Sequence, residues 1–270
     1  GKVKELAHKF GKPNGALPPS GLPSWPWSYT ALFLTEYYLA TGDDYVLPAI
    51  KRYALTFAKG QSLVGTWGHG MAQNGMLGGY GEMNATTLPC WLSLILARKC
   101  GVNEPVVQAA VEQSHKFLGF YVNKGGTPYG DHPPGRGSHD NNGKDAFAAV
   151  AFDLAGDGEG TRFFSKMAIA GYGEKEGGHT GNYFSYLWGP LGVRRAGRTA
   201  VSAFMKEQRW YYDLARRWDG QFVYQGWWDD SYTGSDMTGP FLLAYALPLQ
   251  KLFITGKDMQ RRNDLSATEV

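Results

Sequence analysis

The chain lacks the features that mark several large protein classes. No run in its 270 residues approaches the ~18–20 consecutive apolar residues of a membrane-spanning helix, so we expect no membrane span. Charge of one sign is lacking as well: 27 Lys and Arg are mixed with 24 Asp and Glu, for a net charge of +3. A dedicated nucleic-acid binder is therefore not expected, because it would carry a basic stripe. A Walker-type phosphate-binding motif is also missing.

Cysteine is scarce, with only Cys90 and Cys100 in the chain. Both fall on or just after one predicted helix, and ten residues of helix separate their Cα atoms by ~15 Å, which is beyond disulfide reach. We expect two reduced, buried thiols. The sequence has no cysteine-based zinc spacing, and we predict no metal and no cofactor.

Glycine and aromatic residues are what the chain has in excess. Glycine accounts for 37 residues, about twice the usual ~7%. Aromatic residues make up 14% of the chain, which excludes a disordered protein. The N-terminal segment 1–7 contains no apolar signal core, and localisation is left open at this point.

Helical patterns recur along the chain in pairs. One helix of a pair is apolar nearly all round, as in 85–99, and its partner is amphipathic, as in 104–122. Pro248 predicts a kink in the last helix, and segment 3–10 is a candidate for one more helix. The predicted helices span residues 29–40, 43–59, 85–99, 104–122, 144–155, 161–170, 182–191, 198–218 and 238–255.

Short and long connections alternate between these helices. In an up-and-down array all connections of one kind lie at the same end, so the long glycine-rich ones should meet at one rim. This pattern predicts an all-α fold, an α/α toroid of inner and outer helices. We expect an N-terminal extension over 1–27, the toroid domain over 28–256 and a C-terminal tail over 257–270.

Several of the long connections carry a glycine pair or an Asp-Gly pair, most often close to an aromatic residue, ahead of a predicted helix. The segments are Gly78-Gly79-Tyr80-Gly81-Glu82, Gly125-Gly126-Thr127-Pro128-Tyr129-Gly130, Gly177-Gly178-His179 and Asp219-Gly220-Gln221-Phe222. They resemble the repeats of terpenoid-cyclase and protein-prenyltransferase toroids, an architecture shared with six-hairpin glycosidases and polysaccharide lyases. The resemblance implies the fold. It does not carry over cyclase or prenyltransferase activity, because the acid, diphosphate and zinc motifs of those enzymes are missing.

Candidate catalytic residues lie on the long connections. His139 and Asp140 form an acid–imidazole pair, which suits a general base. His179 and Tyr183 form a couple of the kind that abstracts and delivers protons in β-elimination, with Arg136 or Asn142 neutralising a substrate carboxylate. Glu82, paired with Asp140, Asp229 or Asp236, could instead supply the two acids of a glycosidase.

Candidate substrate-binding residues are aromatic and polar side chains of the same connections. Aromatic faces flanked by acids suit sugar rings. The same side chains could equally pack the glycine-rich loops against one another without a ligand. The predicted binding residues are Trp67, His69, Tyr80, Arg136, Asn142, Trp227, Trp228, Asp230 and Asp236.

These patterns favour a carbohydrate-active enzyme that cleaves a glycan by hydrolysis or β-elimination. Two alternatives stay open: a non-catalytic toroid that binds a glycan or a protein, and an isoprenoid-binding toroid. The expected partner is a glycan or other small molecule, with no nucleic acid. The glycan hypothesis would imply a secreted or periplasmic protein, and the oligomeric state is not predicted.

Overall fold

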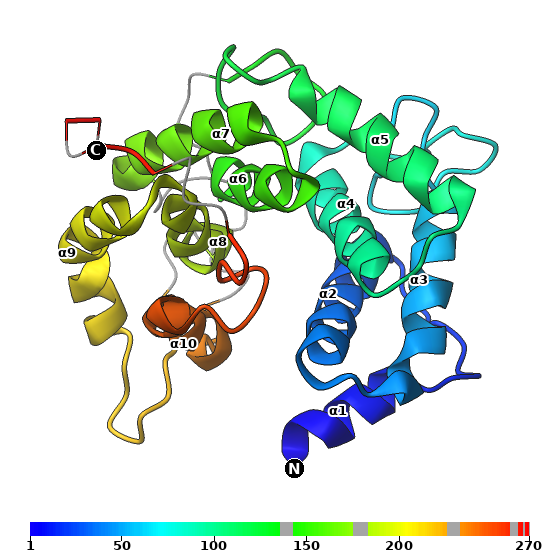
Figure 1. Cartoon of the computed structure of the whole chain (residues 1–270), viewed down its shortest axis with the longest axis horizontal. Coiled ribbons are helices and arrows are strands. Elements are labelled where there is room, and N and C mark those ends of the chain that lie inside the picture. The colour runs from blue at the N-terminus through cyan, green and yellow to red at the C-terminus, as the bar shows by residue number, and fades with distance from the viewer. Residues whose placement is uncertain (136–142, 175–182, 226–232, 260–263, 267, 270) are drawn as a thin grey trace. The chain divides into compact units, whose positions relative to one another are not determined.

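The computed structural model describes the chain except residues 136–142, 175–182, 226–232, 260–263, 267 and 270. The described part is all-α, with isolated β-bridges and no strand (Figure 1). The chain is divided into two compact units. Unit 1 comprises residues 1–120 and 129–131, and unit 2 comprises residues 121–128 and 132–270. The closed ring of the predicted toroid and its domain bounds stay predictions.

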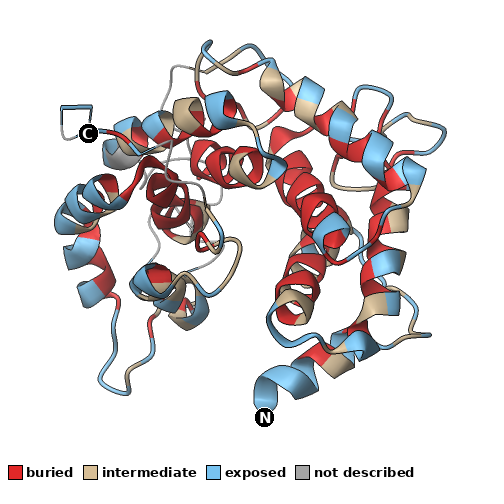
Figure 2. Ribbon diagram, in the orientation of Figure 1, coloured by how far each residue is buried: buried red, intermediate tan, exposed pale blue. Residues whose placement is uncertain are grey.

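Unit 1 holds two pairs of helices and the N-terminal helix. The apolar α4 packs against α2, and the amphipathic α5 covers α4 and α3. Figure 2 shows α4 buried along most of its length, while α5 alternates between buried and exposed residues. Both cysteines are reduced and buried in this unit, as predicted. The helices are α1 (Lys2–Phe10), α2 (Ser24–Thr41), α3 (Leu47–Lys59), α4 (Asn84–Lys99) and α5 (Pro105–Gly119).

Unit 2 repeats the pattern of apolar and amphipathic helices. α6 is buried over most of its residues and packs against both α7 and α8. Glycine in the left-handed conformation bounds α6 on both sides, at Gly143 (φ +75°) and Gly156 (φ +84°). The helices are α6 (Lys144–Ala155), α7 (Gly158–Ala170), α8 (Tyr183–Val193), α9 (Arg198–Leu214) and α10 (Thr238–Ala246).

The last predicted helix is shorter than the sequence suggests. α10 ends at Ala246, and a 3-10 turn over Leu247–Leu249 replaces the helix that was expected to reach residue 255. Pro248 lacks the amide N–H that continues an α-helix, and Gln250 turns the chain with φ +48°. Pro248 therefore lies in the segment that ends the helix instead of kinking it.

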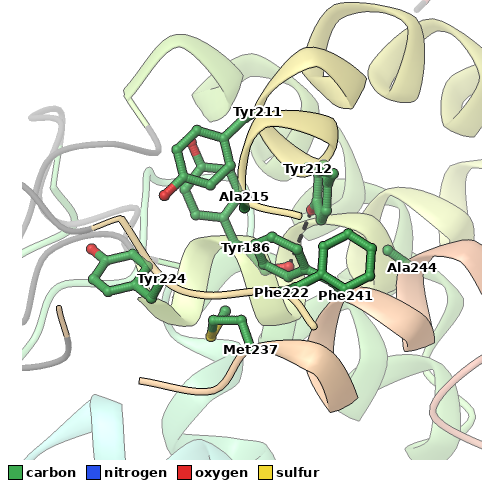
Figure 3. Close-up of a cluster of buried hydrophobic side chains, with 9 residues drawn as sticks. All are labelled: Tyr186, Tyr211, Tyr212, Ala215, Phe222, Tyr224, Met237, Phe241 and Ala244. Carbon is green, nitrogen blue, oxygen red and sulfur yellow. Dashed lines mark hydrogen bonds between the residues drawn. The ribbon is translucent and has the colours of Figure 1, made fainter. Parts of the chain in front are cut away.

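An aromatic cluster fills the core of unit 2 where α8, α9 and α10 meet (Figure 3). The rings of Tyr186 and Tyr211 stack with centroids 3.8 Å apart. The hydroxyl of Tyr212 donates a hydrogen bond to the carbonyl oxygen of Tyr186 at 3.2 Å. Phe222, from the connection between α9 and α10, packs 5.4 Å from the ring of Phe241. Aromatic packing thus fixes the part of this connection that contains Phe222 onto the helices.

The close approach of α8 to α6 requires glycine at position 192. A Cβ at Gly192 would meet the Cα of Ala146 and lie 2.6 Å from its Cβ. We expect Gly192→Ala to lower the free energy of unfolding by about 1–3 kcal/mol, because the helix must shift to make room. Chemical denaturation measures it. Gly189→Ala is the matched control on the same helix, since its nearest contact would be Phe204 Cζ at 3.3 Å. Equal stability of the two variants would contradict the prediction.

A carboxylate anchors α1 to the turn after α2. Asp43 Oδ2 accepts hydrogen bonds from the hydroxyl of Tyr37 at 2.7 Å and from His8 Nε2 at 2.8 Å. The bond from Tyr37 and then that from His8 lower the pKa of Asp43 from 3.8 to about 2. A carboxyl whose pKa falls on folding stabilises the fold above its unfolded value and loses that contribution as the pH drops through its folded value.

We therefore expect α1 to detach from unit 1 as the pH falls from about 4 towards 2. The amide NMR shifts of α1 should titrate in this window. In Asp43→Asn the amide shifts should lack this step, because the titrating carboxyl is gone. A wild-type midpoint near the ordinary value of 3.8 would contradict the prediction.

Candidate functional site

Polar and aromatic side chains gather at the N-terminal ends of α2 and α4 in unit 1. They come from the first turn of α2, from the long connection between α3 and α4, and from the short segment 129–131. The connection and the segment both meet α4 at its start, since the amide of Ala85 donates to the carbonyl of Tyr129 at 3.2 Å. We call this cluster the Tyr80 site; its residues are Trp25, His69, Tyr80, Glu82, Tyr129 and Asp131.

The first turn of α2 holds His69 in place. The backbone amide of Ser24, in the first turn of α2, donates to the carbonyl oxygen of His69 at 3.1 Å. The loop thus supplies an acceptor for one of the N–H groups that have no partner within the helix at its start. The indole Nε1 of Trp25 donates to His69 Nδ1 at 2.9 Å. Both the backbone and the ring of His69 are thus fixed by α2.

Tyr80 projects from the connection into solvent. Gly79 (φ +67°) and Gly81 (φ +85°) flank it in the left-handed conformation that side chains disfavour. The Tyr80 side chain is 63% exposed. Its ring centroid lies 6.1 Å from that of His69 and 6.0 Å from that of Tyr129, both edge-on. The exposed ring is therefore braced on two sides and offers a flat surface to a ligand.

Two carboxyl groups of the site, those of Glu82 and Asp131, interact electrostatically. The half-buried position of Glu82 raises the pKa of its carboxyl, and the negative charge of Asp131 raises it further. The backbone next to Asp131 is held at the start of α4 by Asn84, whose Nδ2 donates to the carbonyl of Gly130 at 2.6 Å. A carboxyl with a raised pKa keeps its proton to higher pH and can act as a general acid.

A hollow of about 470 Å³ opens in the connection between His69 and Tyr80. Gly70, next to His69, and Gly78, two residues before Tyr80, form part of its wall. Its volume is within the range of small-molecule sites. The lining residues are Gly70, Met71, Gln73, Met76, Leu77 and Gly78.

The structure places three of the predicted residues, His69, Tyr80 and Glu82, in one site. Trp67 needs a correction: it is fully buried, and its indole donates to the carbonyl of Phe57 at 3.0 Å. A buried indole cannot stack on a sugar, so Trp67 is a packing residue of the loop. Asp236 lies in unit 2, where its Oδ1 accepts from the amide of Thr238 at 2.8 Å at the start of α10.

The remaining predicted residues fall outside the described part of the chain. For Tyr183 this concerns the side chain, since its backbone begins α8. The others are Arg136, His139, Asp140, Asn142, His179, Trp227, Trp228 and Asp230.

The candidate residues chosen from the sequence did not include Trp25, Tyr129 or Asp131. A recurring tripeptide, Tyr-Gly-acid, could have revealed two of them. It occurs at 80–82, at 129–131 and again at 172–174, and the first two copies lie side by side in unit 1. Trp25 has no comparable signal, because its contact with His69 spans 44 residues.

A family model described as "Domain of unknown function (DUF6288)" matches residues 2–256. The chain belongs to this family. The DUF6288 match takes in residues of both compact units. No curated protein and no solved structure matches the chain.

Among the described residues, no three His, Cys, Asp or Glu side chains are grouped so that they could hold a metal ion. Within the same part of the chain, no helix has the length and apolar character to cross a membrane.

Proposed function

We propose that the Tyr80 site binds a carbohydrate and that the protein hydrolyses it with Glu82 as proton donor. The observation that carries the proposal is the raised pKa of Glu82, next to Asp131 and near an exposed, braced tyrosine ring. Sugar rings stack on aromatic faces, and their hydroxyls bond to carboxylates. The α/α toroid expected from the sequence is part of the same proposal.

Hydrolysis needs one protonated and one ionised carboxyl group. Glu82 would give its proton to the glycosidic oxygen as the bond to the anomeric carbon breaks. Asp131 would take a proton from the water that adds to that carbon. The β-elimination alternative depends on His179 and the Tyr183 side chain, which lie outside the described residues. The interaction between Glu82 and Asp131 in the Tyr80 site supports hydrolysis.

A panel of xylan, cellulose, mannan, pectin and alginate tests the proposal. New reducing ends without unsaturated uronates would support hydrolysis. Unsaturated uronates, detected by their ultraviolet absorption, would overturn it in favour of β-elimination. Binding without any product would favour the non-catalytic glycan-binding alternative, and no binding to any glycan would refute the proposal.

Removing the exposed ring should weaken glycan binding. We expect Tyr80→Ala to reduce affinity about two- to tenfold, because an aromatic contact is worth about 0.5–1.5 kcal/mol. Isothermal titration with the glycan that the panel identifies measures it. Phe120→Ala is the control, since Phe120 is also exposed, at 52%, and follows α5. A larger loss in the control than in Tyr80→Ala would contradict this role of Tyr80.

A further inference from the structure

We propose that the hollow beside the Tyr80 site takes an aromatic acyl group that is esterified to the bound sugar. The preferred substrate is then a glycan that carries hydroxycinnamoyl esters. The preference of the hollow for an aromatic ring follows from its own lining, whereas the sugar attached to that ring rests on the proposed function.

The lining of the hollow favours an aromatic occupant. Its apolar side chains are those of Met71, Met76 and Leu77. None of the described residues that line it is charged, and Gln73 alone among them has a polar side chain. Thioether sulfur makes favourable contacts with aromatic rings, and methionine adapts its shape to them. A sugar ring would instead leave hydroxyl groups against apolar walls without hydrogen-bond partners, which is costly.

Two of the apolar walls rest on glycine residues of the same connection. A Cβ at Gly60 would lie 2.7 Å from both Cβ and Sδ of Met71, so Met71 packs directly on the backbone that ends α3. A Cβ at Gly68 would lie 3.6 Å from Leu77 Cδ2. Met71 and Leu77 are therefore seated against bare backbone, which fixes the shape of the hollow.

A tight hairpin forms the third wall. Gln73 and Met76 exchange backbone hydrogen bonds of 2.9 and 3.0 Å. The two residues between them, Asn74 (φ +51°) and Gly75 (φ +76°), both have the positive φ of a type I′ turn. The amide of Leu63 donates to the carbonyl of Gly75 at 2.9 Å, which ties the hairpin to the start of the connection. Met76 is 73% exposed, so its side chain gains apolar contact by covering a ring in the hollow.

The hollow is continuous with the Tyr80 site along the backbone. Gly70 directly follows His69, and Gly78 precedes Tyr80 by two residues. Consecutive Cα atoms are about 3.8 Å apart, so these two walls lie within about 8 Å of the Cα atoms of His69 and Tyr80. One ligand can therefore place a sugar against Tyr80 and an ester-linked ring in the hollow.

The size of the hollow agrees with this occupant. An apolar cavity of about 150 Å³ takes up benzene, whereas this hollow has a volume of about 470 Å³. It therefore has room for a benzene ring together with the three-carbon chain and the ester of a hydroxycinnamoyl group.

NMR of the full chain with ¹³C-labelled methionine methyl groups tests the hollow directly. The probe is methyl ferulate, an aromatic ester without a sugar. It should shift the methyl signals of Met71 and Met76, because an aromatic ring changes the magnetic field at groups beside it. Met71→Leu and Met76→Leu identify these two signals by removing them. The signals of Met167 on α7 and Met205 on α9 are the internal controls and should stay in place.

A pair of leucine variants shows where the probe binds. Leu77→Asn puts an amide into the apolar wall and should weaken the binding of methyl ferulate about two- to tenfold. Leu63→Asn is the matched control, since Leu63 belongs to the same connection, is 74% exposed and does not line the hollow. A wild-type spectrum in which millimolar methyl ferulate leaves Met71 and Met76 unshifted would overturn the inference. So would equal losses of affinity in the two leucine variants.

Feruloylated arabinoxylan oligosaccharides, before and after alkaline removal of the esters, separate this inference from the proposed function. The esterified form should bind about two- to tenfold more tightly, and Leu77→Asn should remove the difference. Equal binding of both forms to the wild type would refute the aromatic preference. If neither form binds while methyl ferulate still shifts the methionine signals, the sugar and the proposed function fail, and the assignment of the hollow to an aromatic ring stands.

Discussion

Replacing Arg195 with methionine is expected to lower the free energy of unfolding by about 3–5 kcal/mol. The Arg195 side chain is fully buried, and its Nε lies 3.2 Å from Asp153 Oδ2 on α6. Its Nη1 donates to the carbonyl of Leu191 at 3.0 Å and also to that of Ile254, while Nη2 donates to Phe253 at 2.8 Å. The variant would leave a largely buried carboxylate without its cation and three carbonyls without their donor.

Urea denaturation monitored by circular dichroism measures this loss. Arg209→Met is the matched control, because Arg209 is 70% exposed and pairs with Asp213 at 3.2 Å on the surface of α9. An exposed pair of this kind contributes about 0.5 kcal/mol or less. The expectation fails if Arg195→Met and Arg209→Met unfold at the same urea concentration.

Glu82→Gln should abolish most of the proposed glycan hydrolysis, with kcat falling about 100-fold or more. Glutamine keeps the shape of the side chain and has no acidic proton to give to the leaving oxygen. Reducing-end assays on the glycan from the panel measure the rate. Glu112→Gln on α5 is the control, since Glu112 is exposed and bonded to Gln108 at 2.9 Å. A Glu82→Gln variant with wild-type kcat would remove Glu82 from the mechanism.

The pH profile gives a second test of the same group. The proton donor must be protonated, so activity should fall as the pH rises through the raised pKa of Glu82. Asp131→Asn removes the proposed base as well as the negative charge that contributes to this rise, so in that variant the Glu82 carboxyl is followed by ¹³C NMR instead of by activity, and its titration should move to lower pH. A titration that moves to higher pH, or that stays in place, would show that the two carboxyl groups do not interact.

The helices of this chain could be predicted well where a local signal bounds them. α6 was expected at 144–155 and is found over the same residues, because glycine with positive φ flanks it on both sides. The amphipathic stripe of α5 is likewise confirmed: Val107, Val111, Ser114 and Leu118 are all buried. The predicted end of α10 was wrong, because a 3-10 turn and the left-handed Gln250 stop the helix.

The candidate site could be predicted only in part. Tyr80 and Glu82 lie in a glycine-rich motif that the sequence displays, and their flanking glycines explain why the loop exposes Tyr80. Trp67 lies in the same connection and is buried instead, because its side chain bonds to α3 and its backbone to α4. Such tertiary hydrogen bonds decide which aromatic residue of a loop faces solvent. They cannot be predicted from the local sequence of the loop.

Residues 129–131 belong to unit 1, whereas the chain on both sides of them belongs to unit 2. A gene truncated after Phe120 would thus encode all five helices of unit 1 and none of the tripeptide that carries Tyr129 and Asp131. Such a fragment should need a synthetic peptide, or the rest of the polypeptide supplied in trans, to regain its second carboxyl group. A cut after Phe120 therefore removes from unit 1 the segment 129–131, which carries one of the two carboxyl groups on which the proposed activity depends.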